Sequence, residues 1–256
     1  MDPRVEELLP IIQSFGLDLP TIPEVRTAFA KAAADVPLPK GLEFDRGELA
    51  GMGALFVRAA DTAPTRRILY FHGGGYVFGG VEAQKGMACR LALACGLEIV
   101  QPEYRLAPEH PCPAAVEDAV AAYKALAADG RPVAAISGDS AGGGLAILAA
   151  IALRDEGVTP PPIVAFSPWV DAGLSGARFK AGYHDVVLPR SLLEMSRSAW
   201  LGDKAGNDPA ASPLYANLSS LPPTMIHAGG DEVLLDDATR LAARLGEAGV
   251  EVSLTV

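Results

Sequence analysis

The sequence predicts an α/β fold in which a mostly parallel sheet is covered by helices on both faces. Three observations predict it. Short apolar runs alternate with helical segments from about residue 42, two of these runs end in glycine-rich motifs, and 256 residues suffice to bury a large core. Ligands of such sheets bind at the carboxyl ends of the strands, so we expect the functional residues directly after the apolar runs.

The first segment, residues 1 to about 40, precedes the sheet and is expected to form short helices. Its apolar residues recur at helical spacing, and prolines interrupt it at positions 10, 20, 23, 37 and 39. It is either a packed amino-terminal extension or part of a lid, and neither is favoured. Residues 41–256 then form the main domain.

The alternating part follows. We expect strands over residues 49–57, 68–71, 97–100, 133–136, 163–166, 224–228 and 251–256, and helices over residues 83–95, 114–127, 141–154 and 238–248. The helix over 114–127, for example, places its apolar residues on one face. Residues 171–214 carry no clear strand, which predicts an inserted helical region.

The string Gly138-Asp139-Ser140-Ala141-Gly142 stands between an expected strand and an expected helix. A Gly-x-Ser-x-Gly pattern in that context is typical of a nucleophile elbow. Ser140 is therefore the expected nucleophile, and the N–H of Ala141 would point at the developing oxyanion. A glycine-rich phosphate loop is the weaker alternative, because neither Gly-x-Gly-x-x-Gly nor a Gly-Lys-Ser/Thr ending is present.

The string His72-Gly73-Gly74-Gly75 follows another expected strand. Glycines allow backbone N–H groups to approach a substrate without obstruction by side chains. We expect Gly73 and Gly74 to complete the oxyanion hole, with Gly75 supporting the loop and His72 holding it by a hydrogen bond.

Asp231 follows the expected strand over 224–228 and is the expected acid of a Ser-Asp-His order. Glu232 is a rival, whereas Asp236 and Asp237 are expected to cap the next helix. No convincing base is present among His72, His110, His184 and His227. We expect a histidine in the loop after the strand over 251–256, just beyond Val256, so that the carboxy-terminal strand and helix of the fold are incomplete.

Taken together, the motifs resemble the bacterial hormone-sensitive-lipase-like esterases (family IV carboxylesterases) of the α/β-hydrolase fold. The resemblance is carried by the strings at 72–75 and 138–143 and by those at 104–111, 212–215 and 231–236. It implies hydrolysis of short- to medium-chain acyl esters without a metal or organic cofactor. It also implies a helical cap built from residues 1–40 and 171–214, and a possible homodimer if the carboxy-terminal edge is present.

The composition of the chain argues against several other classes of protein. A net charge of −10 argues against nucleic acid as a partner. Three cysteines do not make a disulfide framework, and four scattered histidines do not support a zinc site. The amino-terminus lacks the apolar core of a signal peptide, and no apolar stretch is long enough for a bilayer, so we expect a cytoplasmic protein without membrane contact.

A carboxylesterase is thus the first hypothesis. The alternatives are a non-catalytic, small-molecule-binding relative, like the gibberellin receptors that resemble this family and lack the catalytic histidine, and an amidase or deacetylase on the same framework.

Overall fold

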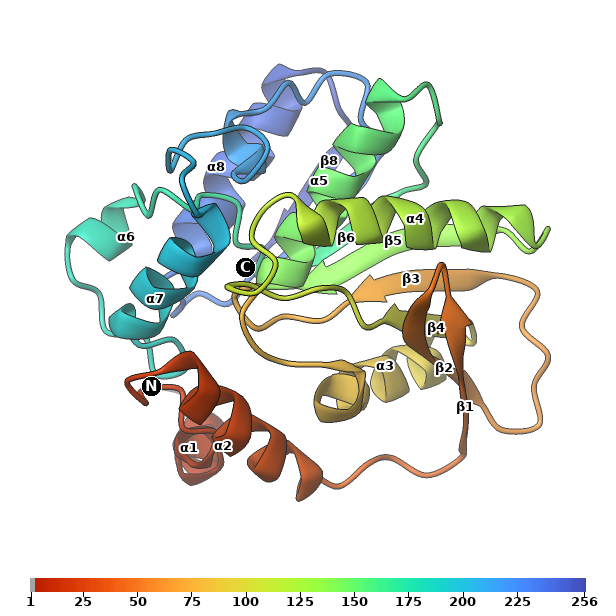
Figure 1. Cartoon of the computed structure of the whole chain (residues 1–256), viewed down its shortest axis with the longest axis horizontal. Coiled ribbons are helices and arrows are strands. Elements are labelled where there is room, and N and C mark those ends of the chain that lie inside the picture. The colour runs from red at the N-terminus through yellow and green to blue at the C-terminus, as the bar shows by residue number, and fades with distance from the viewer. Residues whose placement is uncertain (1–2) are drawn as a thin grey trace.

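The computed structural model describes residues 3–256 and contains one eight-stranded sheet (Figure 1). Its strands are β1 (Leu42–Leu49), β2 (Met52–Ala59), β3 (Arg67–Phe71), β4 (Glu98–Pro102), β5 (Val133–Asp139), β6 (Ile163–Phe166), β7 (Thr224–His227) and β8 (Val252–Thr255). Their order is β1-β2-β4-β3-β5-β6-β7-β8, and the six strands from β4 to β8 in this order are parallel. The predicted α/β fold with a mostly parallel sheet is confirmed.

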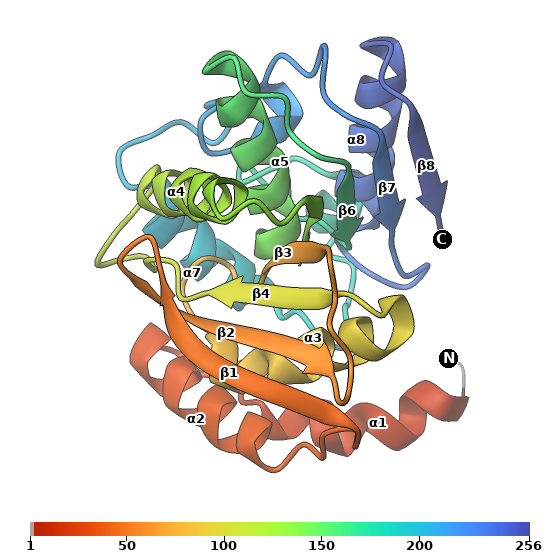
Figure 2. The same cartoon turned by 90° about the vertical axis from the view of Figure 1, so that its right-hand side faces the viewer.

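The helices are α1 (Pro3–Ser14), α2 (Ile22–Ala34), α3 (Val81–Cys95), α4 (Ala114–Ala128), α5 (Ala141–Asp155), α6 (Ala177–Lys180), α7 (Arg190–Leu201) and α8 (Leu235–Glu247). A short 3-10 helix, η1, covers Pro213–Tyr215. The sheet lies between α3 on one face and α4, α5 and α8 on the other (Figure 2). Within residues 3–256, every helix is too short or too polar to cross a membrane.

The amino-terminal part of the sheet differs from the prediction. Instead of one strand over 49–57, β1 and β2 form an antiparallel hairpin that turns at Ala50 and Gly51. Both turn residues have positive φ angles, 52° and 80°, as two-residue hairpin turns require. An alanine at such a position gives little sign of a turn in the sequence, so the apolar residues on either side are typical of one continuous strand.

The amino-terminal helices also differ in their ends. α1 continues through Pro10, where a break was predicted, because a proline removes one helical hydrogen bond without necessarily ending the helix. α2 begins after Thr21, whose side chain accepts a hydrogen bond from the N–H of Glu24 at 3.4 Å. Residues 171–214 contain α6, α7 and the start of η1 and no strand, as predicted.

The register of the strands brings four loops to one edge of the sheet. Phe71 on β3 pairs with Gly138 on β5, and Asp139 pairs with Phe166 on β6. Phe166 pairs in turn with His227, and His227 with Thr255 on β8. The segments that follow β3, β5, β7 and β8 therefore leave the sheet side by side.

Candidate active site

Ser140 lies in a strained turn between β5 and α5. Its φ and ψ angles are 51° and −119°. A residue other than glycine in this region stores about 1–3 kcal/mol, which the surrounding structure must offset. The N–H of Ser140 donates to the carbonyl of Phe166 at 2.9 Å, and its carbonyl accepts the N–H of Trp169 at 2.9 Å. The end of β6 thus holds the turn predicted as a nucleophile elbow.

Close backbone packing places the elbow against the end of β3. A Cβ atom added to Gly142 would overlap the carbonyl oxygens of Phe71 and His72. Only glycine allows this approach, because the first turn of α5 lies directly on the strand that leads into the His-Gly-Gly-Gly loop. The two motifs that are far apart in the sequence are therefore neighbours.

Asp139 connects the same two motifs through its side chain. Its Oδ1 accepts the N–H of Gly73 at 3.0 Å and the hydroxyl of Tyr70 at 2.7 Å. Burial raises the pKa of Asp139, while these two hydrogen bonds act in the opposite direction. The N–H of Gly73, one of the predicted oxyanion donors, is therefore already engaged by a carboxylate.

The other two predicted donors are free. Within the described part of the chain, the N–H groups of Gly74 and Ala141 make no hydrogen bond with another backbone or side-chain group. Gly74 has a φ of 116°, and a Cβ atom there would overlap the carbonyl of Phe78, so the loop requires glycine at this position. Ala141 is the first residue of α5, where the N–H has no acceptor within the helix.

His72, the first residue of the His-Gly-Gly-Gly loop, is fully buried and holds the loop through its ring. Its Nδ1 lies 2.7 Å from the carbonyl oxygen of Gly73, and its ring stacks on Tyr104 with centroids 4.3 Å apart. The hydroxyl of Tyr104 donates to the carbonyl of His72 at 2.7 Å. Burial lowers the pKa of His72 to about 4, so the ring is neutral at pH 7 and acts as a fixed part of the loop.

Two of the four acidic residues after β7, Asp236 and Asp237, bind the backbone of the segment that follows β6. Asp236 and Asp237 lie in the first turn of α8 but do not cap it, which corrects the prediction. Asp237 accepts the N–H groups of Val170 and Asp171 at 2.8 and 2.9 Å, and burial raises its pKa to about 7. Asp236 accepts the N–H of Arg178 on α6. Both join α8 to the segment that follows β6.

The other two acidic residues, Asp231 and Glu232, lie on the loop between β7 and α8. Asp231 is exposed, and the hydroxyl of Tyr183 donates to its Oδ1 at 3.3 Å. Glu232 is partly buried and folds back toward Gly229. The structure thus places the predicted acid at the predicted strand end, with its rival pointing inward beside it.

None of the histidines in residues 3–256 forms a hydrogen bond with the hydroxyl of Ser140. His227 lies on β7 and stacks on Phe166, with centroids 5.6 Å apart, while His110 and His184 are exposed. We call the loop after β7, which carries Asp231 and Glu232, the acid loop. The end of β8 lies close to it: a Cβ atom on Gly230 would be 3.8 Å from the side chain of Val256. Val256, the residue that follows β8, therefore lies beside the loop that carries Asp231 and Glu232.

Helices α2 and α7, from the amino-terminal segment and the insertion, pack against the residues that directly follow the His-Gly-Gly-Gly loop. Trp200 on α7 stacks on Tyr76, with ring centroids 3.8 Å apart and nearly parallel planes. Arg26 on α2 donates to the carbonyls of Val77 and Ala107 at 2.6 and 2.9 Å. The contacts of Tyr76 and Arg26 could not be predicted from the sequence, because a contact between distant segments leaves no local pattern.

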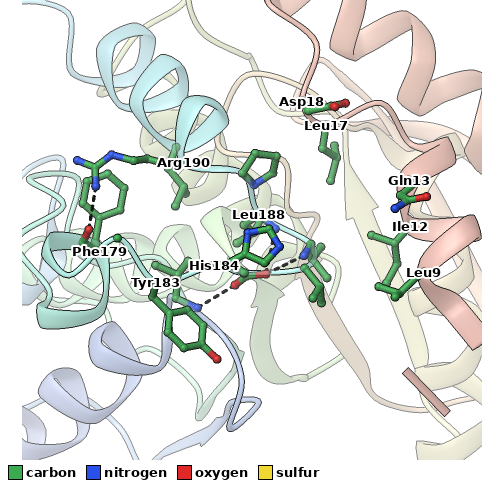
Figure 3. A pocket seen from close by; sticks show the side chains of 17 residues that line it. Leu9, Ile12, Gln13, Leu17, Asp18, Phe179, Tyr183, His184, Leu188 and Arg190 are labelled. Carbon is green, nitrogen blue, oxygen red and sulfur yellow. Dashed lines mark hydrogen bonds between the residues drawn. The ribbon is translucent and has the colours of Figure 1, made fainter. Parts of the chain in front are cut away.

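A cavity of about 590 Å³ opens between the amino-terminal helices and the insertion (Figure 3). Leu9, Ile12 and Leu17 lie on one side of it, and His184 and Leu188 lie on the other (Figure 3). Val233, two residues after Asp231, also lines the cavity. The two segments predicted to form a cap therefore line one open, mostly apolar cavity that borders the loop after β7.

The fold and the site together define an α/β hydrolase with a nucleophile elbow beside a glycine-rich loop. Known proteins agree, since a family model described as alpha/beta hydrolase fold matches residues 68–256. The chain is 39% identical to an acetyl-hydrolase of Streptomyces hygroscopicus over 192 residues. These residues make up 73% of this chain and 64% of that protein. It is 32% identical over 209 residues to an esterase of Acinetobacter venetianus, covering 80% of this chain and 69% of that one.

Solved structures narrow the family further. A crystal structure of an esterase from the bacterial hormone-sensitive lipase family has 36% sequence identity and a TM-score of 0.93, covering 100% of this chain and 88% of that chain. The chain belongs to this family of α/β hydrolases and is a carboxylic ester hydrolase. It spans about two thirds of the length of the two relatives named above, 64% and 69%.

Proposed function

We propose that the protein hydrolyses short- to medium-chain acyl esters through an acyl-enzyme intermediate on Ser140. The observation that carries this proposal is the strained backbone of Ser140 beside two unused N–H groups, those of Gly74 and Ala141. A strained turn that presents a hydroxyl next to free backbone donors is the arrangement needed for attack on an ester carbonyl.

In the proposed reaction, the hydroxyl oxygen of Ser140 attacks the ester carbonyl and the developing oxyanion is bound by Gly74 and Ala141. One such donor contributes about 3–4 kcal/mol to transition-state stabilisation. Gly73, the third predicted donor, would have to share its N–H between Asp139 and the oxyanion. Collapse of the tetrahedral intermediate releases the alcohol, and water then hydrolyses the acyl-enzyme.

The base is proposed to be a histidine from the segment after β8, oriented by a carboxylate of the loop after β7, where the sequence predicts Asp231. The pairing of Thr255 with His227 and the position of Val256 beside Gly230 support this placement. The histidine would take the proton of Ser140 and pass it to the leaving alcohol.

The substrate range is proposed from the cavity. A mostly apolar cavity of about 590 Å³ beside the loop after β7 suits an acyl or alkyl chain of modest length better than a long lipid chain. The named relatives, an acetyl-hydrolase and esterases, support this class of substrate. In this proposal α1, α2 and the insertion act as the cap over the site.

The test is hydrolysis of p-nitrophenyl esters by protein expressed from its complete reading frame, with Ser140→Ala as the comparison. We expect loss of at least about 10³-fold in kcat for the variant, because removing a nucleophile leaves only residual catalysis by the oxyanion hole and binding. A series from acetate to laurate should peak at acetate, butyrate or hexanoate. Equal turnover by wild type and Ser140→Ala would contradict the proposal.

A further inference from the structure

Glu232 has a buried carboxylate oxygen that lacks a partner. Its Oε2 is inaccessible to solvent and forms no hydrogen bond with any group of the described residues. Its Oε1 lies 2.6 Å from the position of a Cβ atom on Gly229, so the side chain folds back toward the end of β7. A buried acceptor without a donor is costly, which indicates that a donor from elsewhere completes this site.

Asp231, its neighbour, faces the other way. The side chain is exposed, and its contact with the hydroxyl of Tyr183 is long, at 3.3 Å. The guanidinium of Arg178 lies over the ring of Tyr183, 4.8 Å from its centroid, so this tyrosine belongs to the surface of the insertion. The carboxylate of Asp231 is thus directed toward the insertion and solvent.

The backbone around Glu232 is held on both sides. Arg178 donates through Nη1 to the carbonyls of Gly230 and Glu232 at 2.9 and 2.8 Å. The N–H of Val233 donates to the buried Oδ2 of Asp185 at 2.8 Å. The peptide groups that precede and follow the 231–232 peptide are thus both held, so the loop presents its inward-facing carboxylate in one position. A group that orients another side chain must be fixed in this way.

The end of β8 lies where a side chain of the following segment could approach the loop after β7. Val256, the residue that follows β8, lies beside Gly230, two residues before Glu232. A side chain on the segment after β8 would therefore start beside this loop, where the buried Oε2 of Glu232 lacks a donor. The carboxylate of Asp231, in contrast, is exposed and already accepts a hydrogen bond from Tyr183.

We propose that Glu232, and not Asp231, is the acid that orients the catalytic histidine and stabilises its charged form. The inference rests on the proposed function, because it needs the histidine base. The N–H of the imidazole would donate to Oε2 of Glu232 and so supply the missing hydrogen bond. Asp231 then serves the surface contact between the acid loop and the insertion.

The first test compares Glu232→Gln with Asp231→Asn. Replacing a triad acid by its amide lowers kcat by about 10²–10⁴-fold, so we expect a loss of this size for Glu232→Gln. The loss for Asp231→Asn should be at least tenfold smaller. Glu232→Asp should recover part of the activity, because it restores the charge on a shorter side chain.

A pH profile separates this role from a structural one. The acid limb of kcat/KM reports the pKa of the histidine base, and a carboxylate beside an imidazole raises that pKa. The acid limb should therefore move to lower pH, by about one unit, in Glu232→Gln and keep its position in Asp231→Asn. A change that only loosens the loop would lower the plateau without moving the limb.

Gly229→Ala gives an independent test that leaves both carboxylates in place. The new Cβ atom would meet Oε1 of Glu232 at 2.6 Å, and a flexible side chain can move away at little cost in stability. The carboxylate would then leave its position, so kcat should fall at least tenfold. Gly230→Ala is the matched control, because its nearest contact is an ordinary 3.8 Å to Val256.

The outcomes are distinct. Large losses in Glu232→Gln and Gly229→Ala, with a shifted acid limb and unchanged melting temperatures, support Glu232. A larger loss in Asp231→Asn than in Glu232→Gln, or wild-type activity in Glu232→Gln, overturns the assignment while leaving the nucleophile intact. Turnover that is equal in wild type and Ser140→Ala contradicts the proposed function itself, whatever the Glu232 variants show.

Discussion

The carboxylate of Asp139 accepts the backbone N–H of Gly73 at 3.0 Å and so joins the nucleophile elbow to the oxyanion loop. The two segments are 66 residues apart in the sequence. The same oxygen also accepts the hydroxyl of Tyr70 at 2.7 Å. The position of the His-Gly-Gly-Gly loop relative to Ser140 is therefore held in part by a side chain that neither reacts nor binds substrate in the proposed mechanism.

Asp139→Ala should reduce kcat/KM for p-nitrophenyl butyrate by about 10–100-fold, because the loop loses its connection to the elbow and the donors become less well placed. Asp139→Asn is the matched control, since the amide oxygen can still accept both hydrogen bonds. It should retain most of the activity. Equal losses in the two variants would show that the charge of Asp139, and not its hydrogen bonds, is required.

Arg26 should contribute to stability mainly through carbonyl groups rather than through its ion pair. It donates to the carbonyls of Val77 and Ala107 and pairs with Glu109 at 2.7 Å. This pairing lowers the pKa of Glu109 to about 2, but the glutamate is mostly exposed, and exposed pairs contribute at most about 1 kcal/mol.

We therefore expect Arg26→Met to lower the free energy of unfolding by about 1–3 kcal/mol, as hydrogen bonds from a charged donor to partly buried carbonyls are lost. Glu109→Gln should change it by less than about 0.5 kcal/mol at pH 7. Urea unfolding of both variants measures the difference. Comparable losses would mean that the ion pair dominates the contact.

The stability of the protein should fall in mild acid because of His72. Its folded pKa of about 4 lies below the unfolded value of about 6.5, so the folded state resists protonation. Stability from this residue is fully present above pH 6.5 and is lost as the pH falls toward 4. Between pH 7 and pH 5 the expected loss is about 2 kcal/mol.

Urea unfolding at both pH values, on wild type and His72→Gln, measures the contribution of the histidine. The variant should be less stable at pH 7 but should lose less stability on acidification. An equal loss in both proteins would assign the pH dependence to other groups.

Both glycine-rich motifs could be predicted because each is a local pattern, in which a strand, a tight turn and a helix follow one another in the sequence. Ser140 and the His-Gly-Gly-Gly loop were found in this way. The hairpin at Ala50 was not, because an alanine rarely adopts a positive φ. The environments of Asp231 and Glu232 were also out of reach, since Arg178 and Asp185, which hold their loop, are about 50 residues away.

The insertion both holds the loop after β7 and lines the cavity, so a substitution in it can affect both. Arg178 and Asp185 fix the acid loop, while Phe179, Tyr183 and Leu188 from the same stretch line the cavity. In the proposed mechanism, remodelling this wall to admit a different acyl group would also shift the supports of the proposed catalytic acid. Swapping the insertion between relatives should therefore alter substrate preference and turnover together, and a chimera should keep its rate only when the acid loop is exchanged with the insertion that holds it.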